Sequence, residues 1–435
     1  MFTLNRQIEV IENVDVVVAG GGPAGICAAV SAARAGASVI MIERYGAVGG
    51  NLTLGNVSPI LGKVSAGTMY TEVIDLLSAE HKGELKVETR NGKEIHIDSE
   101  EAKGILIKLL AESGVKVMLQ SSVSDVIMDG NKITGLVVAT ANGLKAITAK
   151  RVIDATGDGT VAYLAGCEYK MGRDDGRCQP VTLEFTVAGV DESRAIMCFG
   201  GSDPVTLPDG KKYSEFCKEC EQSGILPKNV SIVRLHRTFY AGERNVNATQ
   251  MNEINGLNYN DVYKAEIELR DQIDKVVAFL KKYVPGYENC FVKTTADTLG
   301  VRETRRIMGE YVMCDTDVEQ GLHYDDAIVH NAWFLIDIHN PAGGGQAEGR
   351  SKMAEPYDIR YGAIIPLGVE NLITAGRCIS GTHRAHASYR VMAICMALGE
   401  AAGLAAKLSI DADVTPRELS ATKVREALAA RGVEL

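Results

Sequence analysis

The N-terminal part of the chain alternates between short apolar runs and polar turns. Val14–Ala19 (VDVVVA) is an apolar run of strand length, and Ser38–Glu43 (SVIMIE) is another. Between them, Pro23–Gly36 is rich in alanine and begins with proline, a residue favoured in the first turn of a helix. The pattern therefore predicts a strand–helix–strand unit.

A second group of apolar runs predicts more strands. These runs are Val115–Gln120, Val123–Met128, Ile133–Thr140, Leu144–Ala149 and Arg151–Ala155. The tripeptide Asp129-Gly130-Asn131 between two of them is a strong hairpin signal. A helix is predicted over Glu100–Ser113, where Asp98 and Glu101 have capping-box spacing. We expect an antiparallel insert that feeds back into the main sheet.

The pattern becomes polar and rich in turns after about Arg173. Strand-like pieces such as Val181–Val187 and Ile232–Leu235 alternate with these turns. A charged helix is then predicted over Tyr259–Val284, where Pro285-Gly286 ends it. This middle part is typical of a separate cap or substrate domain.

Buried-strand sequence returns near the C-terminus, at Leu372–Ala375. A long apolar helix is predicted over Ser388–Leu408, and a final helix is expected to be capped by Thr415, Pro416 and Glu418.

The turn after the first strand carries a nucleotide-binding pattern. Residues 20–25 (GGGPAG) contain G-x-G-x-x-G between a predicted strand and a predicted helix. Gly20 permits the tight turn, Gly22 lets the backbone approach a pyrophosphate, and Gly25 lets the helix pack closely on the sheet. Free N–H groups at a helix N-terminus favour the anion. Glu43 ends the next strand, where its carboxylate can accept hydrogen bonds from ribose hydroxyls. These features predict a dinucleotide site on a Rossmann-like fold.

Three further segments favour FAD over NAD. Gly49-Gly50-Asn51 closely follows the ribose acid, and the turn Ala155–Gly159 returns a later strand to the same sheet edge. Ala375–Cys378 (AGRC) precedes a helix expected to start near Ser388. The N-terminus of that helix can point at the pyrimidine end of the isoalloxazine and stabilise negative charge there.

The residues expected to bind FAD come from both ends of the chain. They are Gly20, Gly22, Pro23, Ala24, Gly25, Glu43, Arg44, Gly49, Gly50, Asn51, Val123, Thr156, Gly157, Asp158, Gly376, Arg377, Ser388, Arg390 and Val391. No histidine or cysteine lies between Arg44 and Lys63 to reach the flavin methyl group, so we expect non-covalent FAD. No metal site is expected.

Several segments resemble a known family. They are Leu299–Arg306 (LGVRETRR), Ile336–His339 (IDIH), Ala375–Ser380 (AGRCIS), Arg390–Met392 (RVM) and Gly399–Gly403 (GEAAG). The chain resembles, over nearly its whole length, a bacterial family of FAD-dependent oxidoreductases related to the fumarate reductase and succinate dehydrogenase flavoproteins. The resemblance implies a glutathione-reductase-type FAD fold with an inserted β-rich cap. The full set of substrate-clamping arginines and histidines of the dicarboxylate reductases is not found, so the resemblance names no substrate.

These observations predict an α/β fold, a Rossmann-like FAD-binding domain with an inserted α+β cap. We place the first part of the FAD-binding domain at residues 1–172, the cap at residues 173–360 and the second part of the FAD-binding domain at residues 361–435.

Two histidines are candidates for the reacting groups. His383 lies in a polar cluster just before the helix expected to face the flavin; it is either an acid/base or a loop residue beside the flavin anchor, and His386 is expected to be a loop residue. His339 precedes the glycine-rich segment Ala342–Gly345, which is suited to be a gate over the site.

The charge run after Val301 allows three interpretations, of which the simplest is a solvated helix face. Arg302 and Arg305 are three residues apart and would share one side of a helix, where either is a candidate to bind an anionic substrate. The interpretation we favour is a buried ion-pair network with Glu303 and Arg306 at the junction between cap and FAD-binding domain.

Charge and cysteine usage limit the partners. The net charge of −10 argues against nucleic acid or an anionic membrane. Residues 1–12 lack a basic region followed by an apolar stretch, and ten scattered cysteines are typical of reduced thiols, so a cytoplasmic protein is expected. The lone Cys217-x-x-Cys220 pair is expected to be structural. A homo-oligomer is possible.

The predicted function is hydride transfer between a small organic substrate and flavin N5. No second dinucleotide motif is present, so the electron acceptor or donor stays open. The alternative is a flavoprotein subunit that relays electrons to a redox partner. A third hypothesis, synthesis without net redox turnover as in thiazole-synthesising relatives, is disfavoured by the large cap.

Overall fold

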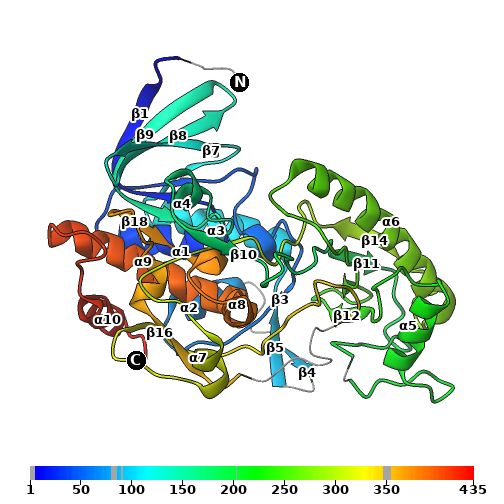
Figure 1. The fold of residues 1–435 in the computed structure, drawn as a ribbon. Coiled ribbons are helices and arrows are strands. Elements are labelled where there is room, and N and C mark those ends of the chain that lie inside the picture. The colour runs from blue at the N-terminus through cyan, green and yellow to red at the C-terminus, as the bar shows by residue number, and fades with distance from the viewer. Residues whose placement is uncertain (1–4, 80–85, 90–91, 202, 346–353) are drawn as a thin grey trace.

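The computed structural model of this protein describes residues 5–79, 86–89, 92–201, 203–345 and 354–435. Residues 1–4 of the N-terminal segment considered above therefore lie outside the described part. The chain forms an α/β unit at one side and a green-coloured α+β unit at the other (Figure 1).

A seven-stranded sheet is the centre of the α/β unit, with the order β6-β2-β1-β9-β8-β7 and β18 paired to β9. The predicted strand–helix–strand unit is present, and β6, β2, β1 and β9 are mutually parallel. The elements of this unit are β1 (Glu9–Ala19), α1 (Pro23–Arg34), β2 (Val39–Ile42), α3 (Ser99–Glu112), β6 (Lys116–Met118), β7 (Ser122–Asp129), β8 (Lys132–Thr140), β9 (Gly143–Asp154), β18 (Leu372–Thr374) and α9 (Met392–Asp411).

The strand β9 joins the antiparallel insert to the parallel sheet. The runs expected at Leu144–Ala149 and Arg151–Ala155 form this single strand. Its first half pairs antiparallel with β8 of the predicted hairpin, and its last residues pair parallel with β18. On its other side it pairs with β1 along both halves. The carboxyl ends of β1, β2, β9 and β18 consequently meet at one edge of the sheet, where ligands of open α/β sheets bind.

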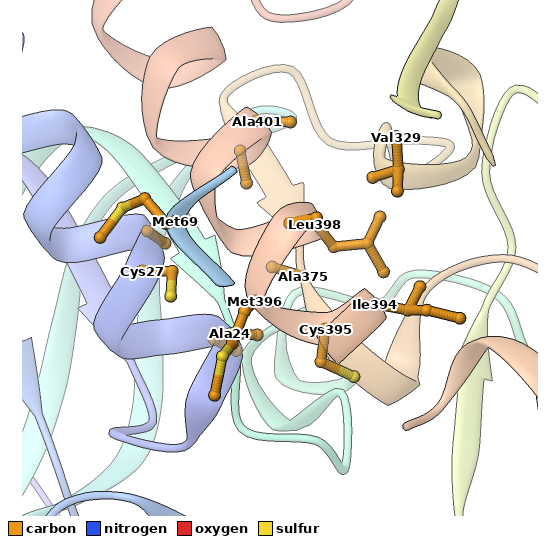
Figure 2. Close-up of a cluster of buried hydrophobic side chains, with 14 of the residues drawn as sticks. Ala24, Cys27, Met69, Val329, Ala375, Ile394, Cys395, Met396, Leu398 and Ala401 are labelled. Carbon is orange, nitrogen blue, oxygen red and sulfur yellow. The ribbon is translucent and has the colours of Figure 1, made fainter. Parts of the chain in front are cut away.

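Helices α1 and α9 pack directly on each other at the centre of the main hydrophobic core. Figure 2 shows part of this core, with Ala24 of α1 beside Met396 of α9. A Cβ atom on Gly399 would overlap the carbonyl oxygen of Ala24, and one on Gly403 would overlap that of Ala28. Glycine therefore lets the two helix backbones approach closely. Among the described helices, α9 alone has the length and hydropathy of a membrane span, and 83% of its most apolar window is buried inside the protein.

A second hydrophobic core, built from residues between Val181 and Val301, lies in the α+β unit. Its elements are β11 (Phe185–Ala188), β12 (Arg234–Arg237), β13 (Arg244–Asn247), β14 (Phe291–Thr295), α5 (Tyr213–Gln222) and α6 (Tyr259–Tyr283). The strands form an antiparallel sheet in the order β12-β13-β11-β14. Apolar side chains of one face, including Leu235, Val246 and Phe185, join the core. We call this sheet the cap sheet.

The remaining elements connect the two units or cover the α/β unit. They are β3 (Pro59–Ile60), α2 (Met69–Ala79), β4 (Lys86–Thr89), β5 (Gly92–His96), α4 (Thr160–Leu164), β10 (Tyr169–Met171), β15 (Arg305–Ile307), α7 (Asp315–Gln320), β16 (Ala327–Ala332), β17 (Tyr357–Arg360), α8 (His383–Tyr389), α10 (Ala421–Ala430) and the 3-10 turns η1 (Gly50–Leu52), η2 (Tyr361–Ile364) and η3 (Gly376–Cys378). Side chains of β16 and β17 pack into the main core of the α/β unit. The domain boundaries at residues 173 and 360 stay predictions.

The expected cap of the last helix is wrong. The Thr415 backbone N–H and hydroxyl donate to the Glu418 carboxylate, which closes a separate turn. Helix α10 begins later, and the Ser420 hydroxyl is its N-terminal cap. The mistake has a simple cause, because a Thr-x-x-Glu sequence makes the same hydrogen bonds in an isolated turn as in a capping box.

Candidate active site

The glycine turn between β1 and α1 leaves one open position. Gly20 has a φ of 99°, and a Cβ atom there would lie 2.5 Å from the carbonyl oxygen of Ala155. A Cβ on Gly25 would overlap the carbonyl oxygen of Gly20. A Cβ on Gly22, by contrast, would meet no described atom within 4 Å. The turn is thus closed toward the sheet and open above Gly22, at the N-terminus of α1.

The carboxylate of Glu43 lies against this turn. It accepts hydrogen bonds from the backbone N–H groups of Gly21, at 2.6 Å, and Tyr45, at 2.9 Å. Burial raises the pKa of Glu43 above its usual value, although the two hydrogen bonds act to lower it. A carboxylate has about four acceptor positions, so it can still accept from a ribose. The Ser121 N–H donates to the Glu43 carbonyl, which brings the start of β7, with Val123, next to this residue.

Asp158 joins four segments that are distant in sequence. Its carboxylate lies 2.6 Å from the guanidinium of Arg377, 2.9 Å from the Thr304 hydroxyl and 3.5 Å from the guanidinium of Arg44. These charges hold the pKa of Asp158 below its usual value although the group is buried. The Arg377 guanidinium lies over Gly157, where a Cβ would come within 2.9 Å of its central carbon. The nearby Thr156 hydroxyl donates to Asp154.

Two more glycine-containing segments reach the N-terminus of α1. A Cβ on Gly50 would lie 3.2 Å from the Cα of Gly22, and one on Gly376 would lie 3.0 Å from the Cβ of Ala24. Asn51 continues the first of these segments in η1. Two of the segments predicted to bind FAD, those with Gly50 and Gly376, therefore meet the start of α1. The open position at a helix N-terminus, bordered by an acid and by close-packed backbone, fits the pyrophosphate and ribose of FAD.

The single helix expected over Ser388–Leu408 is wrong. The chain forms α8, breaks at Arg390–Val391, and continues as α9 with Val391 as its N-cap residue. His386, expected to be a loop residue, is on α8, and so is His383, for which a loop position was one of two interpretations. The break follows from tertiary contacts: the Arg390 guanidinium donates to the Asp337 carbonyl, and Val391 packs against Gly62. Because of this break, the long apolar helix begins at Met392 and not at Ser388.

Ser388 does not present its hydroxyl to the nucleotide-binding turn. The side chain is fully buried, its hydroxyl donates to the Phe334 carbonyl at 2.6 Å, and it lies 3.0 Å from the Tyr357 hydroxyl. These contacts fix α8 on the core.

The helical spacing expected for Arg302 and Arg305 is also wrong. The segment is extended and leads into β15. The Arg305 guanidinium lies 3.9 Å from the centre of the Tyr163 ring, whereas Arg302 donates to the Pro180 carbonyl on another side. An extended backbone sends neighbouring side chains to opposite sides, so the three-residue spacing does not bring these arginines together.

The favoured ion-pair network is present in this segment. The Glu303 carboxylate is buried, pairs with the Arg306 guanidinium and lies 2.9 Å from Nδ1 of His383. The Gln179 backbone N–H donates to its other oxygen at 3.2 Å. Glu303 therefore holds His383 by one ring nitrogen.

His339 and Arg390 share a second carboxylate, that of Asp337. Nε2 of His339 lies 3.4 Å from the Asp337 carboxylate, and the Arg390 guanidinium lies 3.3 Å from it. Burial, and then the charge of Arg302, lower the pKa of His339 to about 4. Burial also lowers the pKa of Arg302 to about 10, with Arg390 adding to the effect. The three predicted residues Arg302, His339 and Arg390 thus lie in one electrostatic group. The Gln179 side chain accepts from the His339 backbone N–H.

The cap sheet contributes residues that were missed from the sequence. Its second face is polar throughout: Arg234 is opposite Asn247, and His236 is opposite Asn245, which is opposite Thr186 on β11. Glu184, the residue before β11, accepts from the Asn247 side chain at 2.9 Å. Most of these residues are buried, with Asn245 at 0% and Glu184 at 4% exposure. We call this set, Glu184, Thr186, Arg234, His236, Asn245 and Asn247, the polar face.

The polar face is turned toward the FAD-binding unit. The Asn245 side chain donates to the Asn56 carbonyl, and the Asn56 side chain donates to the Thr186 hydroxyl. Asn56 follows η1, the segment that packs on Gly22. The charge of Arg234 lowers the pKa values of both Asp337 and His339, which places it near that pair. A small pocket is lined by Arg234, His339, Gln250, Asn229 and Gly345 among others.

The glycine-rich segment Ala342–Gly345 contacts residues that line this pocket. Its Gly344 N–H donates to the Asn229 side chain, and its carbonyl accepts from Gln250. The predicted gate, Ala342–Gly345, lies within the described residues, and its role stays a prediction.

A family model described as FAD-dependent oxidoreductase matches residues 15–428, which is nearly the whole chain. The chain belongs to the FAD-dependent oxidoreductase family. The chain is therefore an enzyme and FAD is its cofactor. Its placement beside the fumarate reductase and succinate dehydrogenase flavoproteins, and its bacterial origin, stay predictions.

Two curated relatives match only part of their own length. Thiamine thiazole synthase of Methanothermobacter thermautotrophicus is 31% identical over 179 residues, 38% of this chain and 65% of the relative. Digeranylgeranylglycerophospholipid reductase 1 of Methanococcoides burtonii is 27% identical over 201 residues, 41% of this chain and 45% of the relative. The chain thus spans less than two thirds of the relatives it matches.

Among solved structures, a geranylgeranyl bacteriochlorophyll reductase-like protein from Thermoplasma acidophilum has the same fold. The TM-score is 0.50 at 16% identity, and the match covers 97% of this chain and 84% of that protein. At this identity the similarity establishes the fold alone, an α/β FAD-binding unit with a second unit.

The cysteine pair on α5 is structural in character. Cys217 and Cys220 are buried free thiols, and burial raises the pKa of Cys217 to about 11. A thiol that resists ionisation is a poor nucleophile for disulfide exchange.

Proposed function

We propose that the enzyme transfers a hydride between FAD and a small organic anion bound between the polar face and the FAD-binding unit. The observation that carries this proposal is the buried polar face itself, because a sheet buried on both sides is normally apolar on both. Burying a polar group costs free energy unless it is hydrogen-bonded, and two oxygens of this face, Oε2 of Glu184 and Oδ1 of Asn245, have no partner among the described residues. FAD, when bound by the segments around Gly22, supplies a hydride-transferring centre.

The charges at this junction favour an anion. Arg234, Arg302 and Arg390 are near one another. Two carboxylates oppose them, Asp337 and, at Arg390, Glu303. Two donors, Nε of Arg390 and Nε2 of Gln179, are buried and have no hydrogen-bond partner among the described residues. Buried donors are almost always paired in proteins, so a ligand rich in acceptor oxygens would satisfy them.

His383 is our candidate to take or give the substrate proton. Glu303 lies at its Nδ1, and a carboxylate at one ring nitrogen favours the tautomer with the proton on that nitrogen. Nε2 is then the basic atom. His339, whose lowered pKa keeps its ring neutral, is our second candidate.

Several finer assignments belong to the same proposal. The predicted FAD-binding residues hold the cofactor without a covalent bond, with Ser388 acting through α8 rather than by its own hydroxyl. The cap lies within residues 173–360, and its core is built from residues between Val181 and Val301. Small organic molecules, rather than nucleic acids or membranes, are the partners.

The first test is anaerobic bleaching of the flavin by a panel of small hydroxy acids, amino acids, alcohols and amines. We expect an acid to bleach it. Arg302→Met should lower the bleaching rate about 100- to 1000-fold, the usual effect of removing one charge-assisted contact from a water-excluded site. The visible flavin spectrum should stay unchanged.

Arg237→Met is the matched control, because Arg237 is an exposed arginine of the same strand as Arg234. It should bleach at the wild-type rate. The site does not select anions if only alcohols or amines bleach the flavin and the bleaching rate of Arg302→Met equals that of the wild type.

A further inference from the structure

One carboxyl of the polar face differs from its neighbours. Glu184 is 4% exposed, and its Oε1 accepts from the Asn247 side chain at 2.9 Å. Its Oε2 is buried and has no hydrogen-bond partner among the described residues. A carboxyl in this position has one hydrogen-bonding atom left for a ligand.

Strand register shows what lies beside Glu184. Arg234 on β12 is directly opposite Asn247 on β13, and Asn247 contacts Glu184 at the start of β11. The three side chains thus form a row across one end of the cap sheet, with neighbouring strands about 4.8 Å apart. Arg302, from the segment before β15, acts electrostatically on Glu184 together with Arg234. Two arginines therefore lie within electrostatic range of a carboxyl group that has one unpaired, buried oxygen.

Burial outweighs the two arginines and raises the pKa of Glu184 to about 8. At neutral pH the group is mostly a carboxylic acid, which can donate a hydrogen bond as well as accept one. A neutral Glu184 supplies no negative charge to balance the positive charges of Arg234 and Arg302.

We propose that Glu184 is a specificity-determining residue of the site, and that its Oε2–H donates a hydrogen bond to a ligand carboxylate held by Arg234 and Arg302. This inference rests on the proposed location of the substrate, and it narrows the substrate class to carboxylic acids. When Glu184 is ionised, binding requires it to take one proton from the solvent. Carboxylate binding is therefore coupled to the uptake of up to one proton.

The neighbouring groups keep a constant charge where Glu184 titrates. His339 is neutral because its pKa is about 4, and His236 is neutral because burial lowers its pKa to about 3. Asp337 stays ionised because His339 and the nearby arginines hold its pKa far below the usual value, against the effect of burial. Arg302 has a pKa of about 10, so measurements should stop near pH 9. Asn247 does not titrate.

The experiment uses the purified FAD-loaded protein and a panel of five carboxylates: acetate, glycolate, lactate, malonate and succinate. Binding is followed by calorimetry and by the change in the flavin spectrum, from about pH 6.5 to about pH 9. For the carboxylate that binds best, the dissociation constant should be flat below pH 8 and rise toward about tenfold per pH unit above it. Proton uptake, from calorimetry in two buffers of different ionisation enthalpy, should approach one per ligand.

Glu184→Gln keeps the shape of the neutral acid and cannot ionise. It should bind the same carboxylate with a dissociation constant that does not change with pH and without proton uptake. Glu215→Gln on the exposed side of α5 is the control, and it should titrate like wild type. Proton uptake in the wild-type protein tests the proposal even if Glu184→Gln does not fold.

The proposal is overturned if none of the five carboxylates binds, or if the best one binds with no proton uptake at about pH 9. Binding needs no turnover, so the result is independent of the bleaching screen. Carboxylates that bind with proton uptake but never bleach the flavin would reject the proposed reaction and support this role of Glu184.

Discussion

Replacing Gly22 with alanine is expected to give a folded protein without bound FAD. The backbone of Gly22 has a φ of −75°, which alanine adopts, and the new methyl group would meet no described atom within 4 Å. That space is where we place the pyrophosphate, so the methyl group should clash only with the cofactor. We expect the affinity for FAD to fall at least about 100-fold, a free-energy loss of about 2.7 kcal/mol.

The measurement combines the visible absorbance of the purified protein with thermal unfolding, with and without added FAD. Gly22→Ala should unfold at the temperature of the FAD-free wild type, and FAD should not raise it. Gly25→Ala is the contrasting variant, because its methyl group would overlap the Gly20 carbonyl even without cofactor. It should lower the unfolding temperature of the FAD-free protein. A yellow Gly22→Ala protein with wild-type affinity would mean that the pyrophosphate lies elsewhere.

Replacing Glu303 with alanine is expected to lower the stability of the protein more than any other single replacement of a charged residue at the junction. Glu303 is 1% exposed and Arg306 is 3% exposed, so the substitution leaves a buried guanidinium without its carboxylate. Breaking such a pair from one side typically costs about 3–5 kcal/mol. His383 loses the contact at Nδ1 in the same step.

Urea unfolding of the FAD-loaded protein measures this effect. Glu310→Ala is the control, because Glu310 also pairs with an arginine, Arg417, but both side chains are substantially exposed, 42% and 35%. Its loss should cost less than about 1 kcal/mol. Equal effects of the two substitutions would contradict the assignment of Glu303 as the buried centre of the network.

The sequence was sufficient for the elements whose signals are local. The glycine turn, the alanine-rich α1 and the Asp129-Gly130-Asn131 hairpin were predicted because their backbone geometry depends on adjacent residues. The strand before the AGRC segment was predicted on the same basis, from a short apolar run. FAD as cofactor and the α/β fold were predicted correctly on this basis.

Only the tertiary structure decided the features that depend on contacts between distant residues. The break between α8 and α9 depends on Asp337, and the extended course of the charge run depends on packing against α4 and β10. The alternation of Val181–Val187 already indicates one apolar and one polar face. It does not show that the polar face is buried, because a strand's two faces are determined by its own sequence, whereas what covers each face is determined by chain segments far away. The glycine turn and the cofactor were therefore accessible to sequence reasoning, and Glu184 and Arg234 were not.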